Sequence, residues 1–271
     1  MSKFWKMNGA GNDFVVVDNL DQSLNLSREQ IATLCQRQRG IGADGLLAVE
    51  PAENGADYRM RYYNADGGEA EMCGNGARCF AKFVNYLSEN SLETTSFETM
   101  AGKISAEFIG DNVRVQLSNP FDQEMNIPLS LEGDTFQVHS INTGVPHAIV
   151  FVDDLAGLDI RKYGAATRYH EHFAPSGTNA NFVEVISSDT IAIRTYERGV
   201  EDETLACGTG MAACALMHHE LNSVPSPVKV RVAGGDTLEI GFEQGEDGGY
   251  QNVTLLGPAE FTFEGTLSNP L

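Results

Sequence analysis

Basic residues are scarce in this sequence. Lysine and arginine number 18 against 38 aspartates and glutamates, which gives a formal net charge of −20 at pH 7. A surface of that charge repels both the phosphate backbone of nucleic acid and anionic lipid. The composition therefore predicts no nucleic-acid partner and no binding to an acidic membrane surface.

Long apolar runs are also missing. The segment 148–152 has five residues and the longest run, 211–217, has seven, whereas a membrane-spanning helix needs about 20 apolar residues. The first residues, MSKFWKMNGAGNDF, lack the apolar stretch of a signal peptide. We therefore expect a cytoplasmic protein with no membrane partner. Hydrophobic residues still make up 42% of the 271 residues, enough to bury a core.

Signatures of disulfide scaffolds, metal sites and cofactors are lacking as well. The five cysteines are an odd number, and no pair has CxxC spacing. The glycines of GIGADG (40–45) match a dinucleotide pattern, but a predicted helix precedes them and a strand follows, the reverse of what that site needs. No lysine stands in a pyridoxal phosphate context. We expect no metal and no cofactor, and we interpret Cys35, Cys79 and Cys214 as packing residues.

Short apolar runs between turn residues predict a strand-rich chain. Strands are expected at 14–18, 46–50, 113–117, 148–153, 182–186, 191–196, 228–232 and 253–256. Helices are expected over 28–38, where Ser27 and Gln30 form a capping-box pattern, and over 75–87 and 209–221, where apolar residues recur at helical spacing. Helices separated by several strands favour the α+β class.

An internal repeat divides the chain near its middle. With an offset of 134, MCGNGA (72–77) aligns with ACGTGM (206–211). With an offset of 135, FVVVD (14–18) aligns with IVFVD (149–153), and Asp44 aligns with Asn179. We predict two similar halves, 1–123 and 124–271. The tail from about residue 258 either stays with the second half or returns to pair with the first.

Each half carries one Cys-Gly-x-Gly at the start of a predicted helix, Cys73 to Gly76 and Cys207 to Gly210. The first turn of a helix has unpaired N–H groups and the positive end of the helix dipole, which lower the pKa of a thiol placed there. Glycines let a ligand approach these N–H groups, which bind carboxylates and oxyanions. Each half is therefore predicted to supply a reactive thiol beside an anion-binding turn.

Two such thiols on one bound carbon suit the inversion of a stereocentre. One thiolate removes an α-proton, and the other thiol returns a proton to the opposite face. Two other interpretations remain: both cysteines are buried packing residues, or they form a regulatory redox pair without catalysis.

The motifs that surround these cysteines resemble the diaminopimelate epimerase family. They are GAGNDF (9–14), YNADGGEAEMCGNGARCFA (63–81), PH (146–147), YERG (196–199) and ACGTG (206–210). The resemblance extends over nearly the whole chain. It implies two pseudo-symmetric halves, each a barrel-like sheet around a central helix, with the active site in the cleft between them. It also implies a homodimer, and a small-molecule amino-acid substrate rather than a macromolecular partner.

The implied activity is the cofactor-independent interconversion of LL- and meso-2,6-diaminopimelate, on the route to lysine and peptidoglycan. By this resemblance Cys73 and Cys207 exchange the roles of base and acid. The reacting-end carboxylate is expected on Gly74, Asn75, Gly208 and Thr209. The distal end is expected on Asn64, Asn179 and Arg198. Asn12 is expected to line the site, and His147 and Glu197 to tune the thiols or orient the substrate.

Two positions depart from the family pattern. Val145 stands where many members have asparagine, and Gly45 where many have glutamine. Both bear on how the distal end of the substrate is held. A racemase of proline or hydroxyproline is the alternative enzyme, and Arg198 distinguishes the two because only a substrate with a second carboxylate needs its guanidinium.

Overall fold

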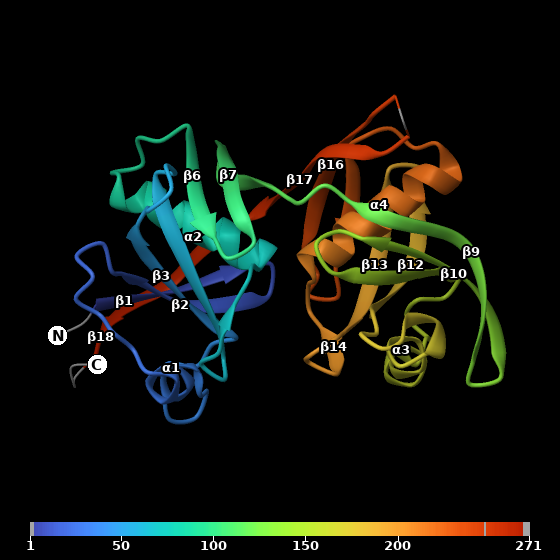
Figure 1. The fold of residues 1–271 in the computed structure, drawn as a ribbon, viewed down its shortest axis with the longest axis horizontal. Helices are drawn as coiled ribbons and strands as arrows, with labels where there is room; N and C mark the ends of the chain where they lie inside the picture. Colours follow the sequence, from blue (N-terminus) through green and yellow to red (C-terminus); the bar gives the residue numbers. More distant parts are fainter. Residues whose placement is uncertain (1–2, 247, 268–271) are drawn as a thin grey trace. The chain divides into compact units, whose positions relative to one another are not determined.

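A computed structural model describes residues 3–246 and 248–267, which form two compact units (Figure 1). Unit 1 comprises Met1–Val115 and Gly257–Leu271, and unit 2 comprises Gln116–Leu256. Both units combine antiparallel and parallel strands with two α-helices each, so the α+β prediction is confirmed. Within the described ranges, no helix has the length and apolarity to span a membrane.

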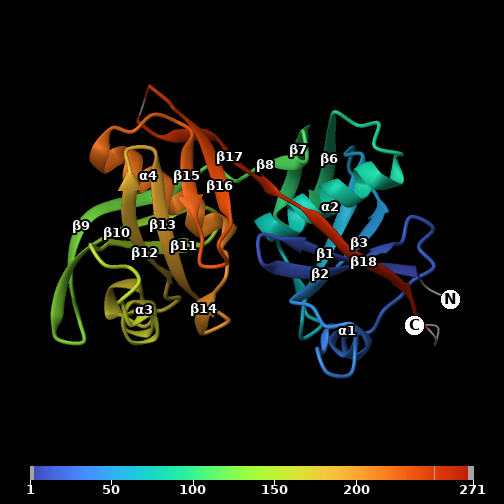
Figure 2. The same cartoon turned by 180° about the vertical axis from the view of Figure 1, so that it is seen from behind.

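Unit 1 is built from the following elements, the last of which returns from the C-terminal end of the chain: β1 (Lys3–Gly9), β2 (Asn12–Asp18), α1 (Arg28–Cys35), β3 (Gly45–Pro51), β4 (Tyr58–Asn64), β5 (Glu69–Ala70), α2 (Gly74–Leu87), β6 (Thr94–Thr99), β7 (Gly102–Ile109), β8 (Asn112–Gln116) and β18 (Glu260–Thr266). Strand β1 pairs antiparallel with both β2 and β18, and Figure 2 shows β18 beside it. The tail thus completes the sheet of unit 1.

Unit 2 contains β9 (Phe121–Leu131), β10 (Asp134–Asn142), β11 (Pro146–Phe151), α3 (Ile160–Arg168), the 3₁₀ turn η1 (Glu171–Phe173), β12 (Asn179–Ser187), β13 (Thr190–Glu197), β14 (Asp202–Thr204), α4 (Gly208–Asn222), β15 (Val228–Arg231), β16 (Thr237–Gln244) and β17 (Tyr250–Pro258). Strand β11 runs parallel to β12, β12 antiparallel to β13, and β13 parallel to β15. In unit 1, β2, β3, β4 and β6 repeat this pattern. The internal repeat is therefore a repeat of topology.

The parallel strands are buried on both faces, which explains their unbroken apolar runs. Val15, Val17, Leu46 and Ala48 pack with α1 in one core cluster. The opposite face carries α2, which packs against β1, β2, β3, β4 and β7 and has 11 of its 14 residues buried. In unit 2, α3 covers one face and α4 the other. The central helices α2 and α4 thus lie against the strands that carry the candidate site residues (Figure 1).

All eight predicted strands and the helices expected over 75–87 and 209–221 are present. The helix expected over 28–38 is too long by three residues: α1 ends at Cys35, because Gln36 is extended and the N–H groups of Ile41 and Gly42 bond to the carbonyl of Leu34. Helix α3 was not predicted, and neither were strands β1, β4, β5, β6, β7, β9, β10, β14, β16 and β18.

Candidate active site

Both glycine-rich helices begin directly after their cysteine. Cys73 is the N-cap of α2 and Cys207 the N-cap of α4, each with extended backbone angles. Both side chains therefore lie at the end of a helix where the first N–H groups have no acceptor within the helix. The two helices have 14 and 15 residues, long enough to develop a full dipole.

Gly76 and Asn12, both in unit 1, act on the sulfur of Cys73 in opposite ways. The backbone N–H of Gly76 donates to Sγ at 3.5 Å, which favours a thiolate. The Oδ1 atom of Asn12 lies 3.4 Å from Sγ and accepts its hydrogen, which favours the thiol. The same Oδ1 accepts from Nδ2 of Asn75 at 3.4 Å. The structure thus brings Asn12, Asn75 and Cys73 together.

The amide of Asn12 is held in one orientation by Asp44. Nδ2 of Asn12 donates to Oδ2 of Asp44 at 2.8 Å, and an ionised carboxylate only accepts. The other oxygen of Asp44 accepts from Arg37 at 2.7 Å. Asp13 joins this cluster, and although burial raises its pKa, hydrogen bonds from Arg37 and Lys6 hold that pKa well below the usual range. Asp44 therefore makes Asn12 present an oxygen, not an N–H, to Cys73.

Arg78 belongs to α2, one turn after the helix begins, and is completely buried. Its guanidinium donates to the carbonyl of Pro258 at 3.1 Å, to Oδ1 of Asn75 at 3.1 Å and to the carbonyl of Gly74 at 3.4 Å. It thus ties the start of the helix to the segment that leads into β18. A buried positive charge there adds to the helix dipole in favouring a bound anion.

The surroundings of Cys207 differ from those of Cys73. Its Sγ lies 3.6 Å from the hydroxyl of Thr209, and that hydroxyl lies 2.9 Å from Nε2 of His147. The backbone of the same turn is held by Thr143, whose hydroxyl donates to the carbonyl of Thr209 at 2.9 Å. Thr209 therefore contacts the Cys207 thiol directly, and His147 contacts it only indirectly, through the Thr209 hydroxyl.

His147 is neutral over the physiological range. It is completely buried on β11, and burial together with the charge of Arg198 lowers its pKa to about 3. A neutral imidazole has one N–H to donate and one nitrogen that accepts. His147 therefore acts near Cys207 as a hydrogen-bonding group and not as a positive charge.

We predict that His147 makes stability depend on pH. An unfolded histidine takes up a proton below about pH 6.5, whereas the folded pKa is about 3, so stability is complete above pH 6.5 and falls as the pH decreases. Between pH 7.5 and 5.5 the wild type should lose about 1 kcal/mol more than His147→Gln, since the slope reaches about 1.4 kcal/mol per pH unit. Urea unfolding at both pH values measures this. Equal pH dependence in the two proteins would contradict it.

Three further predicted residues, Asn179, Glu197 and Arg198, lie at the start of β12 and at the end of β13. The backbone N–H of Arg198 donates to Oδ1 of Asn179 at 2.8 Å, and Nδ2 of Asn179 donates to the carbonyl of Pro146 at 3.2 Å. The guanidinium of Arg198 bonds to the carbonyl of Ser176 at 3.3 Å. Glu197 precedes Arg198 and is half-buried at the end of β13. Asn179, Glu197 and Arg198 are thus grouped in one unit.

Asn64 lies in unit 1 at the exposed end of β4. The hydroxyl of Tyr62 donates to its Oδ1 at 2.9 Å. The departure at Gly45 is connected to this contact, because a Cβ there would lie 2.8 Å from the Tyr62 ring and 2.5 Å from the carbonyl of Tyr63. The glycine therefore makes room for the tyrosine that holds Asn64. Val145 is half-buried, and its carbonyl accepts from the N–H of Thr143 at 3.2 Å.

The other three cysteines are buried, as predicted. Burial raises the pKa of Cys35 to about 11 and that of Cys79 to about 12, and it raises the pKa of Cys214 as well. These thiols stay protonated and inaccessible, which makes them poor nucleophiles.

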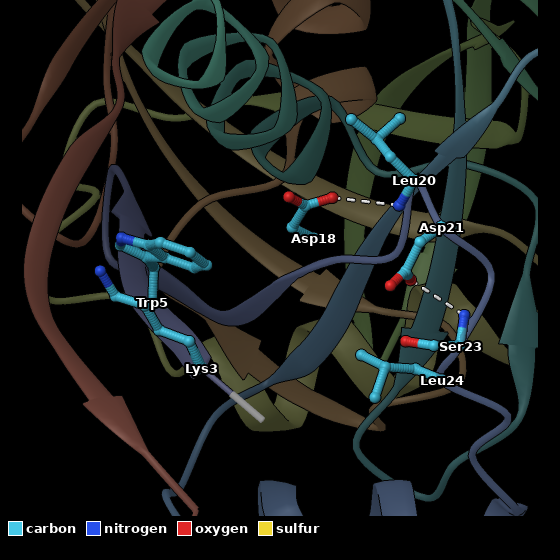
Figure 3. A pocket seen from close by; sticks show the side chains of 7 residues that line it. All are labelled: Lys3, Trp5, Asp18, Leu20, Asp21, Ser23 and Leu24. Atoms are coloured by element: carbon cyan, nitrogen blue, oxygen red, sulfur yellow. Dashed lines mark hydrogen bonds between the residues drawn. The ribbon is translucent and has the colours of Figure 1, made fainter. Parts of the chain in front are cut away.

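A separate pocket in unit 1 shares no residue with either cysteine site. It is lined by Lys3, Trp5, Asp18, Leu20, Asp21, Ser23 and Leu24 (Figure 3). Its two carboxylates accept backbone N–H groups of the same turn at 3.0 Å each. They therefore stabilise the turn. Across residues 3–246 and 248–267, no three His, Cys, Asp or Glu side chains gather as a metal site requires.

Asp44, Arg78 and Asn181 support the site but were not predicted from the sequence. Two features of the sequence involve Asp44, its alignment with Asn179 and its position before Gly45. A signal for Asn181 was present, because residues two apart on a strand face the same side, and Asn181 follows Asn179 by two on β12. For Arg78, only the tertiary structure reveals the burial that distinguishes it from a surface arginine.

Known proteins match this chain over nearly its full length. The family model described as diaminopimelate epimerase matches residues 4–120 and 139–261. Diaminopimelate epimerase from Hydrogenobaculum sp. is 43% identical, and the match covers 97% of each chain. The enzyme of the same name from Chlorobaculum tepidum is also 43% identical, over 97% of this chain and 100% of its own. The solved structure of a phenazine biosynthesis protein of the PhzF family from Bacillus anthracis shares the fold, with a TM-score of 0.70, 14% identity and 97% of each chain covered.

Proposed function

This chain belongs to the diaminopimelate epimerase family, whose members are amino-acid isomerases, and on that premise we propose that Cys73 and Cys207 are its acid–base pair. The observation that carries the proposal is the placement of a cysteine at the N-cap of a buried glycine-rich helix in each unit. Two equivalent sites in a duplicated chain suit a reaction in which the same group acts once as base and once as acid.

The proposed reaction removes one proton from the substrate, returns another, and changes no oxidation state. The thiolate of one cysteine takes the hydrogen from the α-carbon of diaminopimelate, and the bonding electrons pass into the adjacent carboxylate as an enolate-like charge. The thiol of the other cysteine then gives its proton to the opposite face of the same carbon. The roles exchange in the reverse direction, so LL- and meso-diaminopimelate interconvert without an oxidant, reductant or cofactor.

The developing charge on the carboxylate needs donors that are already in place. We assign this role to the first turns of the two helices, which contain Gly74 and Asn75 in α2 and Gly208 and Thr209 in α4. Their N–H groups point out of the helix start, where the dipole favours negative charge. The glycines keep that approach open.

The distal amino-acid end of the substrate is assigned to Asn64, Asn179 and Arg198. A guanidinium matches a carboxylate with two parallel hydrogen bonds, and the asparagines add amide donors and acceptors. Asn12 lines the site beside Cys73. Glu197 and His147 are assigned to the substrate's ammonium group and to the orientation of the thiols.

The remaining family expectations concern the oligomeric state, the cellular compartment and the pathway. We propose a homodimer in the cytoplasm that acts on the route to lysine and peptidoglycan. Light scattering coupled to size-exclusion chromatography tests the dimer, since the 29.4 kDa chain would elute at twice that mass. A mass of one chain at micromolar concentration would remove the dimer from the proposal.

The test of the activity is proton NMR of the reduced protein with LL-diaminopimelate in deuterated water. We expect deuterium at one α-carbon together with the meso product, because the returned proton comes from a thiol that has exchanged with solvent. Proline and hydroxyproline, incubated separately, should show no exchange. Exchange on those substrates and none on diaminopimelate would replace the proposal with the racemase alternative, and no exchange on any of them would leave the redox interpretation.

A further inference from the structure

Asn181 contacts the buried imidazole on the side away from the thiol. It lies on β12 beside β11, is completely buried, and places Nδ2 3.1 Å from Nδ1 of His147. Nothing in the proposed function requires an amide at this position. Its hydrogen bonds nevertheless decide which nitrogen of His147 carries the hydrogen.

The amide of Asn181 has only one satisfactory orientation. Nδ2 lies 3.0 Å from the backbone carbonyl of Ala148, which only accepts, so this atom is the NH₂ group. The hydroxyl of Thr195 donates to Oδ1 at 2.9 Å. The opposite orientation would set two oxygens against each other at Ala148. Asn181 therefore presents an N–H to Nδ1 of His147.

The Nδ1 atom of His147 is the unprotonated nitrogen of the ring. Because Nδ1 accepts from Asn181, the hydrogen of the neutral ring lies on Nε2, which donates to Oγ1 of Thr209 at 2.9 Å. Thr209 then keeps its own hydroxyl hydrogen for Sγ of Cys207, 3.6 Å away. In the other tautomer two donors would face each other at Nδ1, and Nε2 would take the hydrogen of Thr209.

We propose that Asn181 is a positioning residue that selects the Nε2-protonated tautomer of His147 and thereby directs the Thr209 hydroxyl hydrogen to Cys207. Its effect on catalysis rests on the proposed function, whereas the tautomer itself does not. A hydrogen bond donated to sulfur stabilises the thiolate, the form that removes a proton.

Gly210, in the first turn of α4, leaves room for the side chains of Asn181 and Cys207. A Cβ on Gly210 would lie 2.6 Å from Oδ1 of Asn181 and 3.3 Å from Sγ of Cys207. The glycine therefore serves the packing of the asparagine against the helix start as well as the access of a ligand. The corresponding Gly76 of unit 1 has more space, with its nearest neighbours at 3.4 Å.

The tautomer is measured by NMR of protein labelled with ¹⁵N-histidine, without substrate, with His147→Gln used to assign the resonances. The wild type should show an unprotonated Nδ1 and a protonated Nε2 for His147 from pH 8 to pH 5. In Asn181→Asp, whose carboxylate accepts, Nδ1 should become protonated, and kcat/KM for diaminopimelate should fall about tenfold, the size of one hydrogen bond.

Asn222→Asp is the matched control, because Nδ2 of Asn222 lies 3.1 Å from Nδ1 of His218 at the far end of α4. It should change the His218 resonances and leave those of His147 and the epimerase rate unaltered. A protonated Nδ1 in wild-type His147 would overturn the proposal, whether or not the Asn181 variant folds. An unchanged kcat/KM in a folded Asn181→Asp with altered tautomer would overturn it too. A wild type without epimerase activity would instead refute the proposed function, and the spectrum would still test the tautomer.

Discussion

Replacing either Cys73 or Cys207 with alanine should abolish the interconversion of LL- and meso-diaminopimelate. Each substitution removes one of the two groups that exchange a proton with the α-carbon, and a positioned acid or base contributes about 10²–10⁴-fold to a rate. We therefore expect turnover to fall by at least that factor in both variants. The meso product formed in deuterated water, followed by proton NMR under reducing conditions, measures it.

Cys214→Ala is the matched control for this experiment, since it makes the same change within helix α4. The Cys214 side chain is completely buried, and burial raises the pKa of its thiol. The control should keep the wild-type rate and lose only some stability, because a small core side chain is shortened. Substantial inversion by Cys73→Ala or Cys207→Ala would remove that cysteine from the mechanism.

Replacing Arg78 with methionine should produce the largest loss of stability among the site variants. The change keeps most of the side-chain length but removes the guanidinium, so the buried Oδ1 of Asn75 and the part-buried carbonyl of Pro258 lose its hydrogen bonds. Each buried unsatisfied group costs about 1–3 kcal/mol. We expect the free energy of unfolding to fall by about 3 kcal/mol or more, as measured in urea at pH 7.5.

Arg161→Met serves as the comparison. Arg161 makes two hydrogen bonds of 2.8 Å to Asp202, but its side chain is 76% exposed. An exposed ion pair contributes only about 0–1 kcal/mol. If both substitutions lower the free energy of unfolding by the same amount, burial would not explain the contribution of Arg78 to stability.

Local pattern and local chemistry determined much of this protein. The repeat of Cys73 on Cys207 and the apolar spacing after each cysteine predicted two helices that begin at a thiol, and the structure places them there. These predictions succeeded because a helix start depends on residues within one or two turns. The apolar runs at 14–18 and 46–50 predicted strands for the same kind of reason, since a short apolar run between turn residues is visible along the chain.

Helix α3 shows where local pattern was insufficient. Its buried residues are Ile160, Gly164 and Thr167, at helical spacing but small or polar. Gly164 is explained only by its neighbour, because a Cβ there would lie 2.5 Å from Cβ of Tyr196 on β13. A glycine within a helix normally argues against one. Packing against a residue far along the chain overrides that preference.

The tertiary structure alone decided which polar residues support the site. Asp44, Arg78 and Asn181 owe their importance to groups that only the fold brings near: the amide of Asn12, the carbonyl of Pro258 and the imidazole of His147. Which cysteines stand at a helix start could be predicted from the chain itself, because a thiol at a helix start is a local arrangement. How those residues are oriented could not, because a hydrogen bond between distant segments depends on distances that folding creates.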